Sequence, residues 1–498
     1  MLFNTLQYAK FFAVVFTLAW LLRPWQKARL AVLMVASYVF YAGWPVTWPV
    51  GFFSNPSLDK AAAWVVSWIG YLPLLFFCST LDFVLGRLVE KAESQKAKKG
   101  LLMLTLVSNL GILAVFKYWN FGLETATWVA ARFGLPFPDI SLRLSLPIGI
   151  SFFTFMSLSY VVDVYRGTIP ACRNYLNYLT FIAFFPHLVA GPIVRGRDLL
   201  PALERPVKLT PDLAGEGLFL IACGLVKKVI IGDYLAVNLV DRVFTSPSSY
   251  SALESLAGIY GYAVQVYCDF SGYSDIAIGS ALLIGYRFPL NFDSPFKATN
   301  VANFWRRWHI SLSNWLRDYV YIPLGGSRKG RGRKYLNVFL TMVICGIWHG
   351  AAWTFVVFGI IQGTAVAITH FYRDSLGKKG DHDVGAAPWK TVLAVFTTFT
   401  FTAFSFMFIR AESVAKVVAV LARLPTMTTY HPNLRPGVLL IMLAGLMAQW
   451  APDFVYTQAR QLFSRVPAVA QALILFGLAF ALREAASAEV VPFVYFQF

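Results

Sequence analysis

Two histidines stand where an ionisable ring is costly. His349 lies in "CGIWHGAAWTF" (345–355), near the middle of a 38-residue run, 335–372, that contains no Asp, Glu, Lys or Arg. His309 lies in the aromatic-rich stretch "NFWRRWHISLSNWLRDYVYIP" (303–323). Ionisable groups in apolar segments are functional candidates because their burial costs free energy. A neutral imidazole, with an unperturbed pKa near 6.5, can take the proton of a hydroxyl group as that hydroxyl attacks an activated acyl group. Two such rings could divide proton abstraction and carbonyl binding between them.

Two further places carry polar groups in apolar surroundings. His187, in "FIAFFPHLVAGPIVRGR", follows a proline and precedes a Gly-Pro pair, which predicts a broken or re-entrant helix with a basic tip. A hydrogen-bonded structural role is the favoured interpretation of this ring. Asp269 and Asp275 are six residues apart and so do not share a helical face, which disfavours a carboxylate acid and base pair. Capping or bonding to the backbone near Gly272 is preferred, and a proton relay remains the alternative.

The cysteines do not point to chemistry. The five cysteines are scattered, with no C-x-x-C pair, so we expect neither a disulfide framework nor a metal site. Cys345 lies four residues before His349 and on the same helical face. Its apolar segment does not favour a thiolate, which argues against a nucleophilic Cys–His pair.

The elements that must position these residues are membrane helices. Of the 498 residues, 57% are hydrophobic and 14% are charged, against about 25% charged in an average soluble domain. Apolar runs recur at 11–22, 30–53, 61–81, 101–116, 144–162, 213–226, 256–284, 335–372, 391–409, 437–451 and 468–482. A spanning backbone must satisfy its own hydrogen bonds, so we predict an all-α polytopic membrane protein with about eleven or twelve crossings, plus re-entrant and amphipathic helices.

The long run 335–372 exceeds the length that one perpendicular span requires. Either two helices meet near His349 or one span follows a dip, and Gly346 and Gly350 permit both. A break at this point would line a cavity. The segment 303–323 shows an amphipathic helical pattern, with His309 at the edge of its apolar face and arginines placed to contact lipid phosphates.

The net charge of +18 is concentrated in short basic clusters, which mark cytoplasmic loops. These clusters predict an external N-terminus and a first helix that is retained rather than cleaved. The cluster Arg328, Lys329, Arg331 and Arg333 lies between the two histidine segments. It could contact the phosphates of an anionic cytoplasmic donor, although a simple cytoplasmic loop explains it about as well. A nucleic-acid partner is disfavoured because no soluble basic face with exposed aromatics is evident. No linker separates soluble domains, so residues 1–498 are assigned to one membrane-embedded domain.

The segments "NFWRRWHISLSNWLRDYVYIPLGG" and "GIWHGAAWTFVVFG" together resemble the signature of the membrane-bound O-acyltransferase family, in its bacterial alginate O-acetyltransferase branch. "FFPHLVAGPIVR", "YCDFSGYSDIAIG" and the terminal "VPFVYFQF" extend the resemblance over most of the chain, with a signature core at about 181–372. The resemblance implies a helical fold around a central cavity in the inner membrane. It places His349 at the family's essential histidine and His309 at the second active-site position, where many eukaryotic relatives have asparagine.

The resemblance also implies the reaction. An acetyl group from cytoplasmic acetyl-CoA, with no bound cofactor, would cross the membrane to O-acetylate an alginate-like exopolysaccharide. A separate periplasmic acetyltransferase and the polysaccharide synthesis machinery are the implied partners, besides membrane lipid. D-alanyl transfer to teichoic acid is an alternative within the family. A proton-coupled transporter or flippase using Asp269 and Asp275, or a non-catalytic scaffold, would belong to a different class.

Overall fold

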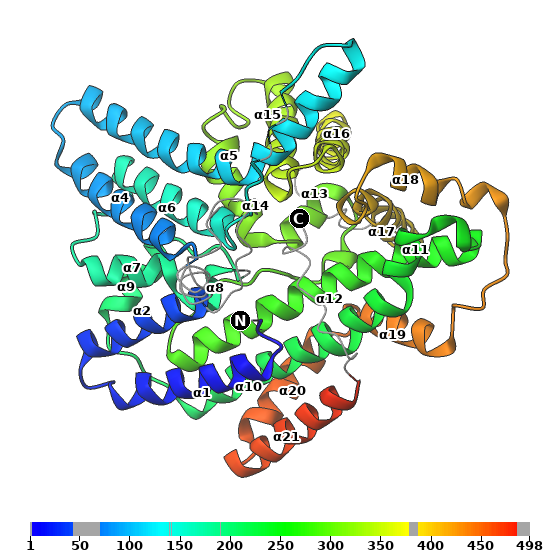
Figure 1. Cartoon of the computed structure of the whole chain (residues 1–498). Coiled ribbons are helices and arrows are strands. Elements are labelled where there is room, and N and C mark those ends of the chain that lie inside the picture. The colour runs from blue at the N-terminus through cyan, green and yellow to red at the C-terminus, as the bar shows by residue number, and fades with distance from the viewer. Residues whose placement is uncertain are drawn as a thin grey trace, which may run out of the picture. The chain divides into compact units, whose positions relative to one another are not determined.

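Every regular element in the described part of the computed structural model is helical (Figure 1). The structure describes residues 2–42, 70–138, 140, 142–189, 191–377 and 387–485. The apolar runs 30–53 and 61–81 therefore fall partly outside the described residues, and the terminal "VPFVYFQF" falls wholly outside them. The predicted all-α class is confirmed.

The chain divides into two compact units, residues 1–209 with 284–286, and residues 210–283 with 287–498. The first unit contains α1 (Leu6–Leu21), α2 (Gln26–Ala42), α4 (Leu72–Lys91), α5 (Gln95–Phe133), α6 (Ile150–Tyr165), α7 (Tyr175–Ala183), α8 (Phe185–Leu188) and α9 (Gly196–Glu204). The assignment of one domain to the whole chain stays a prediction.

The second unit holds the two segments with candidate histidines. Its elements are α10 (Pro211–Leu225), η1 (Val226–Asp233), η2 (Ala236–Val240), α11 (Asp241–Thr245), η3 (Pro247–Ser249), α12 (Ala252–Ile284), η4 (Pro295–Lys297), α13 (Val301–Arg307), α14 (Ile310–Leu316), η5 (Arg317–Tyr321), α15 (Arg331–His349), α16 (Trp353–Ser375), α17 (Pro388–Arg410), α18 (Val414–Leu421), η6 (Leu424–Thr426), α19 (Pro436–Met447), α20 (Asp453–Arg465) and α21 (Ala468–Ala485). The last residue of α12 is grouped with the first unit.

Four of the described helices, α4, α5, α16 and α17, are long and apolar enough to cross a membrane. The bent pair α20 and α21, with 120° between its helices, would raise the number to five. The chain is therefore a multi-pass membrane protein, and the figure of eleven or twelve crossings stays a prediction. Helix α5 continues well beyond the apolar run 101–116, as far as Phe133, and Gly134 ends it at φ 64°. Glycine adopts this left-handed conformation without the penalty of a Cβ.

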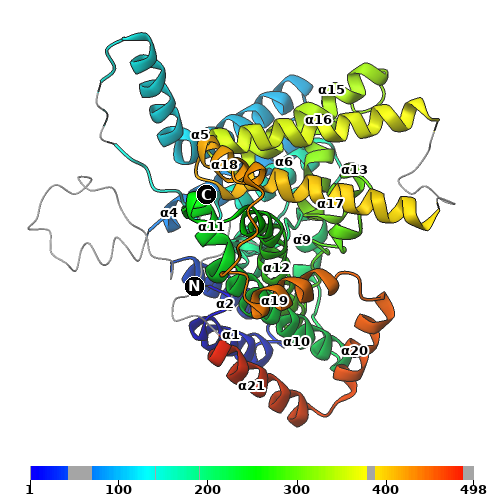
Figure 2. The ribbon, with the colours of Figure 1, turned by 90° about the vertical axis from the view of Figure 1, so that its right-hand side faces the viewer.

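The long uncharged run folds as two helices, α15 and α16, which lie side by side (Figure 2). Of the two alternatives left open by the sequence, two helices meeting near His349 is the one observed, because α15 ends at this residue and α16 begins at Trp353. Glycines allow their close approach: a Cβ on Gly346 would lie 2.7 Å from the Cα of Gly359, and one on Gly363 would lie 2.9 Å from the Phe339 carbonyl. Small residues at helix contacts are the usual means of packing in membranes.

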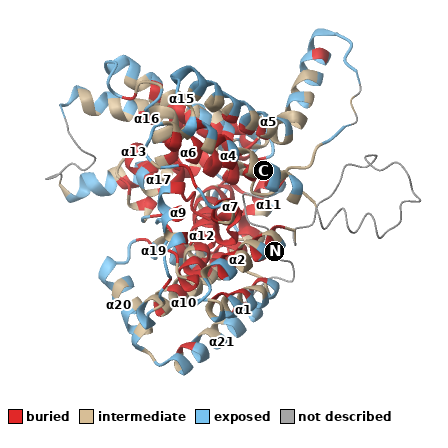
Figure 3. Ribbon diagram, turned by 90° about the vertical axis from the view of Figure 1, so that its left-hand side faces the viewer, coloured by how far each residue is buried: buried red, intermediate tan, exposed pale blue. Residues whose placement is uncertain are grey.

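Helix α12 is buried along nearly its whole length (Figure 3). Glycines on both helices bring it against α10: a Cβ on Gly224 would lie 2.6 Å from the Gly272 carbonyl, and one on Gly272 would lie 2.7 Å from the Gly224 carbonyl. Gly272, in "YCDFSGYSD", is therefore required for helix packing.

Arg29 is not a loop residue, although it lies close to Arg23 and Lys27 in the sequence. It lies in α2, is fully buried, and donates hydrogen bonds to the Ala19 carbonyl at 3.1 Å and the Tyr286 hydroxyl at 2.7 Å. A third bond, of 2.5 Å, reaches the Ile284 carbonyl at the end of α12. A cation at a helix C-terminus satisfies carbonyls that have no partner within the helix.

We predict that Gly359→Ala destabilises the contact between α15 and α16. The new Cβ would lie 2.9 Å from the Met342 carbonyl oxygen and 3.0 Å from the Val343 Cα, both backbone atoms that cannot rotate away. Overpacking of this kind costs about 1–3 kcal/mol, so the midpoint of thermal unfolding in detergent should fall. Gly332→Ala, in the first turn of α15 with no atom within 4 Å of the new Cβ, is the control and should unfold at or slightly above the wild-type temperature. Equal midpoints for the two variants would contradict the packing argument.

Candidate active site

The segment around His309 is broken, where a continuous amphipathic helix was predicted. Helix α13 ends at Arg307 and α14 begins at Ile310. His309 stands between them at φ 43° and ψ 55°. A left-handed conformation is strained for a residue with a side chain and persists only where the surroundings enforce it. The predicted apolar face is nevertheless buried, at Trp305, Trp308, Leu312, Trp315 and Leu316.

The irregular segment before α13, which contains Asn291 and Asp293, holds this break in place. The Ile310 backbone N–H donates to the Asn291 carbonyl at 2.9 Å, and the Asp293 N–H donates to the Arg307 carbonyl at 2.9 Å. Arg307 also donates from its guanidinium to the Asp293 carbonyl at 2.9 Å. Backbone and side-chain bonds thus clamp the chain on both sides of His309.

Asn291 contacts the imidazole of His309 directly, and nothing in the sequence indicated this contact. Its Oδ1 lies 3.1 Å from His309 Nδ1 and accepts the Ser311 hydroxyl at 2.8 Å. The Ser311 backbone N–H also donates to this oxygen, at 3.3 Å. The Asn291 amide nitrogen donates to Ser274 Oγ of α12 at 3.1 Å. A separation of 18 residues from His309 gave no signal that these groups would meet.

The His309 ring is fully buried in aromatic surroundings. Phe270 meets it edge to face at a centroid distance of 4.7 Å, and Trp348 lies at 6.2 Å. His309 lies outside the four candidate spans. Burial lowers the pKa of its ring well below the ordinary value, and the nearby His349 acts in the same direction. The ring is therefore neutral at pH 7.

His349 is the last residue of α15 and is 5% exposed. Its ring lies 5.1 Å from Trp348 and 6.2 Å from Phe358 of α16, centroid to centroid. Because Trp348 contacts both imidazoles, the structure brings together His309 and His349, the two candidate histidines. They come from different helices, 40 residues apart in the sequence.

A chain of hydrogen bonds links α13, α16 and α17 beside this cluster. Trp305 Nε1 donates to Gln362 Oε1 at 3.0 Å, and Gln362 Nε2 donates to Ser405 Oγ at 2.7 Å. Gln362 is fully buried. A buried amide with both ends bonded fixes the relative position of the helices that carry its partners.

A cavity of about 500 Å³ lies beside α14, α15 and α16. Its lining residues are Trp305, Arg306, Ile310, Ser313, Asn314, Leu316, Arg317, Tyr321, Val338, Thr341, Met342, Val366 and His370. The lining therefore combines an apolar wall with two arginines, on α13 and η5. Ile310, the residue after His309, places the cavity next to the histidine cluster.

The four basic residues predicted to contact a donor, Arg328, Lys329, Arg331 and Arg333, are exposed and do not line this cavity. Arg331 is the first residue of α15 and His349 is the last. At 1.5 Å per residue they are about 27 Å apart along the axis. These cations could therefore contact only the far end of a long molecule whose other end reaches His349.

His187 belongs to the other compact unit and has a structural partner. It is fully buried in α8, and its Nε2–H donates to the Phe181 carbonyl at 2.8 Å. The carbonyls in the last turn of a helix have no partner within it, and α7 ends at Ala183. This contact agrees with the favoured structural interpretation. The predicted break in the helix is present at Phe184.

Asp269 and Asp275 bind lysines of η1, so the preferred interpretation, bonding to the backbone, is wrong for their main contacts. Lys228 Nζ lies 2.6 Å from Asp269 Oδ1 and 2.6 Å from Asp233 Oδ1, and Lys227 Nζ lies 2.5 Å from Asp275 Oδ2. The two lysines are adjacent between two apolar runs, but nothing in the sequence indicated that they pair with these aspartates. Buried charges are tolerated when they are paired.

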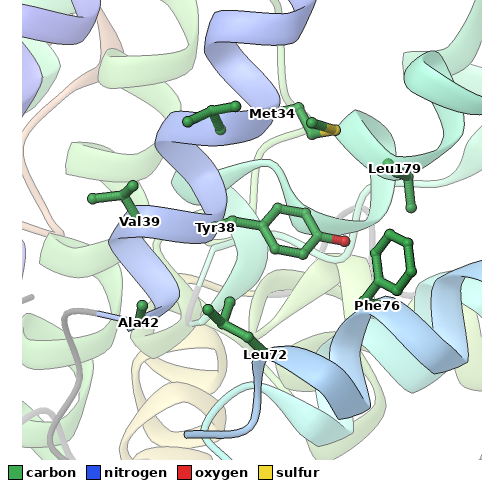
Figure 4. Close-up of a pocket in the computed structure, with 8 residues that line it drawn as sticks. Met34, Tyr38, Val39, Ala42, Leu72, Phe76 and Leu179 are labelled. Carbon is green, nitrogen blue, oxygen red and sulfur yellow. The ribbon is translucent and has the colours of Figure 1, made fainter. Parts of the chain in front are cut away.

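A second cavity, of about 420 Å³, belongs to the first unit (Figure 4). Its lining comes from α2, α4 and α7, with Met34, Val35, Tyr38, Val39, Ala42, Leu72, Phe76 and Leu179. Only the Tyr38 hydroxyl interrupts this apolar wall. The lining contains no acid, base or nucleophile suited to acyl transfer, so this cavity is not a candidate active site.

Comparison with known proteins assigns the family. Residues 59–409 match the sequence profile of MBOAT, the membrane-bound O-acyltransferase family. The match covers more than half of the chain and includes both candidate histidines, and the chain therefore belongs to this family.

Individual relatives are bacterial. A probable alginate O-acetylase of Pseudomonas putida is 41% identical over 344 residues, which are 69% of this chain and 65% of that protein. A peptidoglycan O-acetyltransferase of Helicobacter pylori is 32% identical over 416 residues, 78% of this chain and 72% of that protein. A teichoic acid D-alanyltransferase of Bacillus subtilis is 29% identical over 272 residues, 52% of this chain and 67% of that protein. The chain thus matches slightly less than two thirds of the length of the alginate relative.

We predict that Lys228→Met strongly destabilises the protein, because it leaves Asp233 and Asp269 buried without their counter-ion. Removing one partner of a buried pair costs about 3–5 kcal/mol. Adding Asp269→Asn to Lys228→Met should recover part of the loss, as measured by thermal unfolding in detergent. A double variant no more stable than Lys228→Met would contradict the structural pairing.

Proposed function

We propose that the protein is a membrane O-acyltransferase that takes an acetyl group from cytoplasmic acetyl-CoA for O-acetylation of an alginate-like exopolysaccharide. The observation that carries the proposal is the meeting of His309 and His349 around Trp348, next to a cavity of about 500 Å³ that Ile310 lines. Family membership and the similarity to an alginate O-acetylase and a peptidoglycan O-acetyltransferase support the same reaction class.

His349 is assigned as the general base. In the reaction, the acceptor hydroxyl loses its proton to the imidazole as its oxygen bonds to the thioester carbonyl carbon. The carbon–sulfur bond then breaks, and the thiolate of CoA takes up the proton and leaves. His309 is assigned as the helper that holds the acceptor or the thioester carbonyl. Buried, preoriented groups of this kind need no reorganisation when charge develops.

The donor is proposed to lie along α15. Val338, Thr341 and Met342 line the cavity halfway between the basic first turn of α15 and His349. An extended thioester arm in this cavity would place its acyl end near the histidines. Its phosphates would lie toward Arg306, Arg317 and the exposed cluster at 328–333, where guanidinium groups bind phosphate well.

The protein is proposed to lie in the inner membrane, with the donor entrance on the cytoplasmic side; the basic loops, which favour that side, support this orientation. The acetyl group would be received on the external side by a periplasmic acetyltransferase that acts with the polysaccharide synthesis machinery. Neither CoA nor another cofactor is assigned as a resident group.

Two rival functions make different predictions. D-alanyl transfer would use the same histidines with a carrier-protein thioester, and the teichoic acid D-alanyltransferase relative favours this second candidate. A proton-coupled transporter would use Asp269 and Asp275 as a relay, and their ion pairs with Lys228 and Lys227 argue against this role.

We expect His349→Ala to abolish acyl transfer while the protein still folds in the membrane. Loss of a general base lowers the rate by about 10²–10⁴-fold. The measurements are the O-acetyl content of the polymer in cells that carry each variant, and the release of free CoA from acetyl-CoA by purified protein. His431→Ala, at an exposed histidine, is the control and should behave as wild type. Unchanged O-acetylation in a folded His349→Ala protein would remove the basis of the proposal.

We expect Val338→Trp to weaken donor binding by filling the cavity beside α15. The Michaelis constant for the acyl donor should rise by about tenfold, which corresponds to about 1.4 kcal/mol, with a smaller change in turnover. Ile344→Trp is the matched control on the same helix, because Ile344 is 40% exposed and does not line the cavity. If the two variants gave the same Michaelis constant, the donor would have to bind elsewhere.

A further inference from the structure

We propose that Asn291 is a positioning residue that caps α14 from a distant segment and fixes the tautomer of His309. In this arrangement Nδ1 of His309 carries the hydrogen, and Nε2 is the basic atom of the neutral ring. The catalytic consequence rests on the acyltransferase function proposed above. The tautomer itself depends only on the geometry around the ring.

Helix α14 is capped by Asn291 and not by the residue that directly precedes it. A helix leaves its first backbone N–H groups without partners, and the side chain of the residue before the helix usually accepts one of them. His309 occupies that position in α14, but its side chain makes no such bond. Asn291 supplies both acceptors instead: its carbonyl accepts Ile310 N–H at 2.9 Å, and its side chain accepts Ser311 N–H at 3.3 Å. The imidazole is thereby released from capping.

The side-chain amide of Asn291 is held in one orientation by its hydrogen-bond partners. A backbone N–H can only donate, so the Asn291 atom that faces Ser311 N–H must be the oxygen. The amide nitrogen then points toward Ser274 Oγ, at 3.1 Å. The oxygen and nitrogen of an Asn are normally assigned from their hydrogen-bond partners, and here a main-chain donor settles the assignment.

The orientation of the Asn291 amide determines which nitrogen of the His309 ring carries the hydrogen. The same Asn291 oxygen lies 3.1 Å from His309 Nδ1 and has no hydrogen to donate. His309 Nδ1 must therefore be the donor. In a neutral imidazole the other nitrogen then holds the lone pair, so Nε2 is the atom able to accept a proton or a substrate hydroxyl. The edge-to-face contact with Phe270, at 4.7 Å, restricts rotation of the ring further.

A neutral amide suits this position better than a carboxylate. An adjacent negative charge would favour the protonated imidazole, whereas an amide orients the ring without adding charge. The ring thereby stays neutral beside His349, and its Nε2 can accept a hydrogen bond from the acceptor hydroxyl. Asn291 is thus expected to set the protonation state of His309 as well as the conformation of its backbone.

The decisive variant is Asn291→Asp, which keeps an oxygen for capping and adds a negative charge. Asp and Asn cap helices about equally well, so a purely structural Asn291 would leave the pH dependence of acyl transfer unchanged. The proposal instead expects the acidic limb of the kcat/KM profile to move up by about one pH unit or more. Asn291→Leu, which removes both functions, should lower kcat together with thermal stability.

A matched control is available at Asn174, whose side chain caps α7 by accepting the backbone N–H groups of Leu176 and Asn177. Asn174→Asp makes the same chemical change at a helix cap and should leave both the activity and its pH profile as in wild type. A pH profile of Asn291→Asp that overlays those of wild type and Asn174→Asp would overturn the positioning role.

A second readout does not require activity. In protein labelled with ¹⁵N-histidine, the His309 resonances can be identified by their absence in His309→Gln. The proposal expects a neutral ring protonated at Nδ1 in the wild type and a mixture of tautomers in Asn291→Leu. A wild-type ring protonated at Nε2 would overturn the inference. Correct tautomers in a protein without acyl transfer would instead overturn the proposed function and leave this assignment standing.

Discussion

The close approach of α15 and α16 is the contact on which the candidate site depends. Gly346, Gly359 and Gly363 remove the side chains that would separate the two backbones. The hairpin therefore ends compactly at His349, whose ring reaches Phe358 on the returning helix. In lipid, where apolar surfaces gain little from mutual contact, packing of small residues is a main source of helix association. A looser hairpin would leave His349 without a defined position.

The second requirement is a helix break that the protein must hold against its own preference. The left-handed backbone at His309 is costly, and the contacts of Asn291, Asp293 and Arg307 on either side offset that cost. Strain at a buried residue close to a second histidine is typical of functional sites. Here the strain turns the imidazole into the aromatic cluster, a direction that a continuous helix would not give it.

The paired charges of η1 and α12 illustrate how a basic, apolar chain keeps carboxylates inside. Lys227 and Lys228 neutralise Asp275 and Asp269, so these residues hold helices together and leave the histidines as the chemically available groups. Desolvation makes each charge expensive alone. These ion pairs stabilise the contact between η1 and α12. They also argue against a proton relay through Asp269 and Asp275.

The sequence by itself determined the helical class, offered two helices meeting near His349 as one of two alternatives, and singled out both candidate histidines, because hydrophobic periodicity and the rarity of ionisable residues in apolar runs are local properties. It could not give the break at His309, since residues 303–323 have the periodicity of one helix. Asn291, Gln362 and the lysine partners of Asp269 and Asp275 were also beyond it. Their partners lie 5 to 57 residues away in sequence, and only tertiary packing decides which polar groups meet. The lining of the cavity was beyond the sequence for a related reason: charge composition identifies the basic loop at 328–333, whereas the cavity is formed by side chains of several helices.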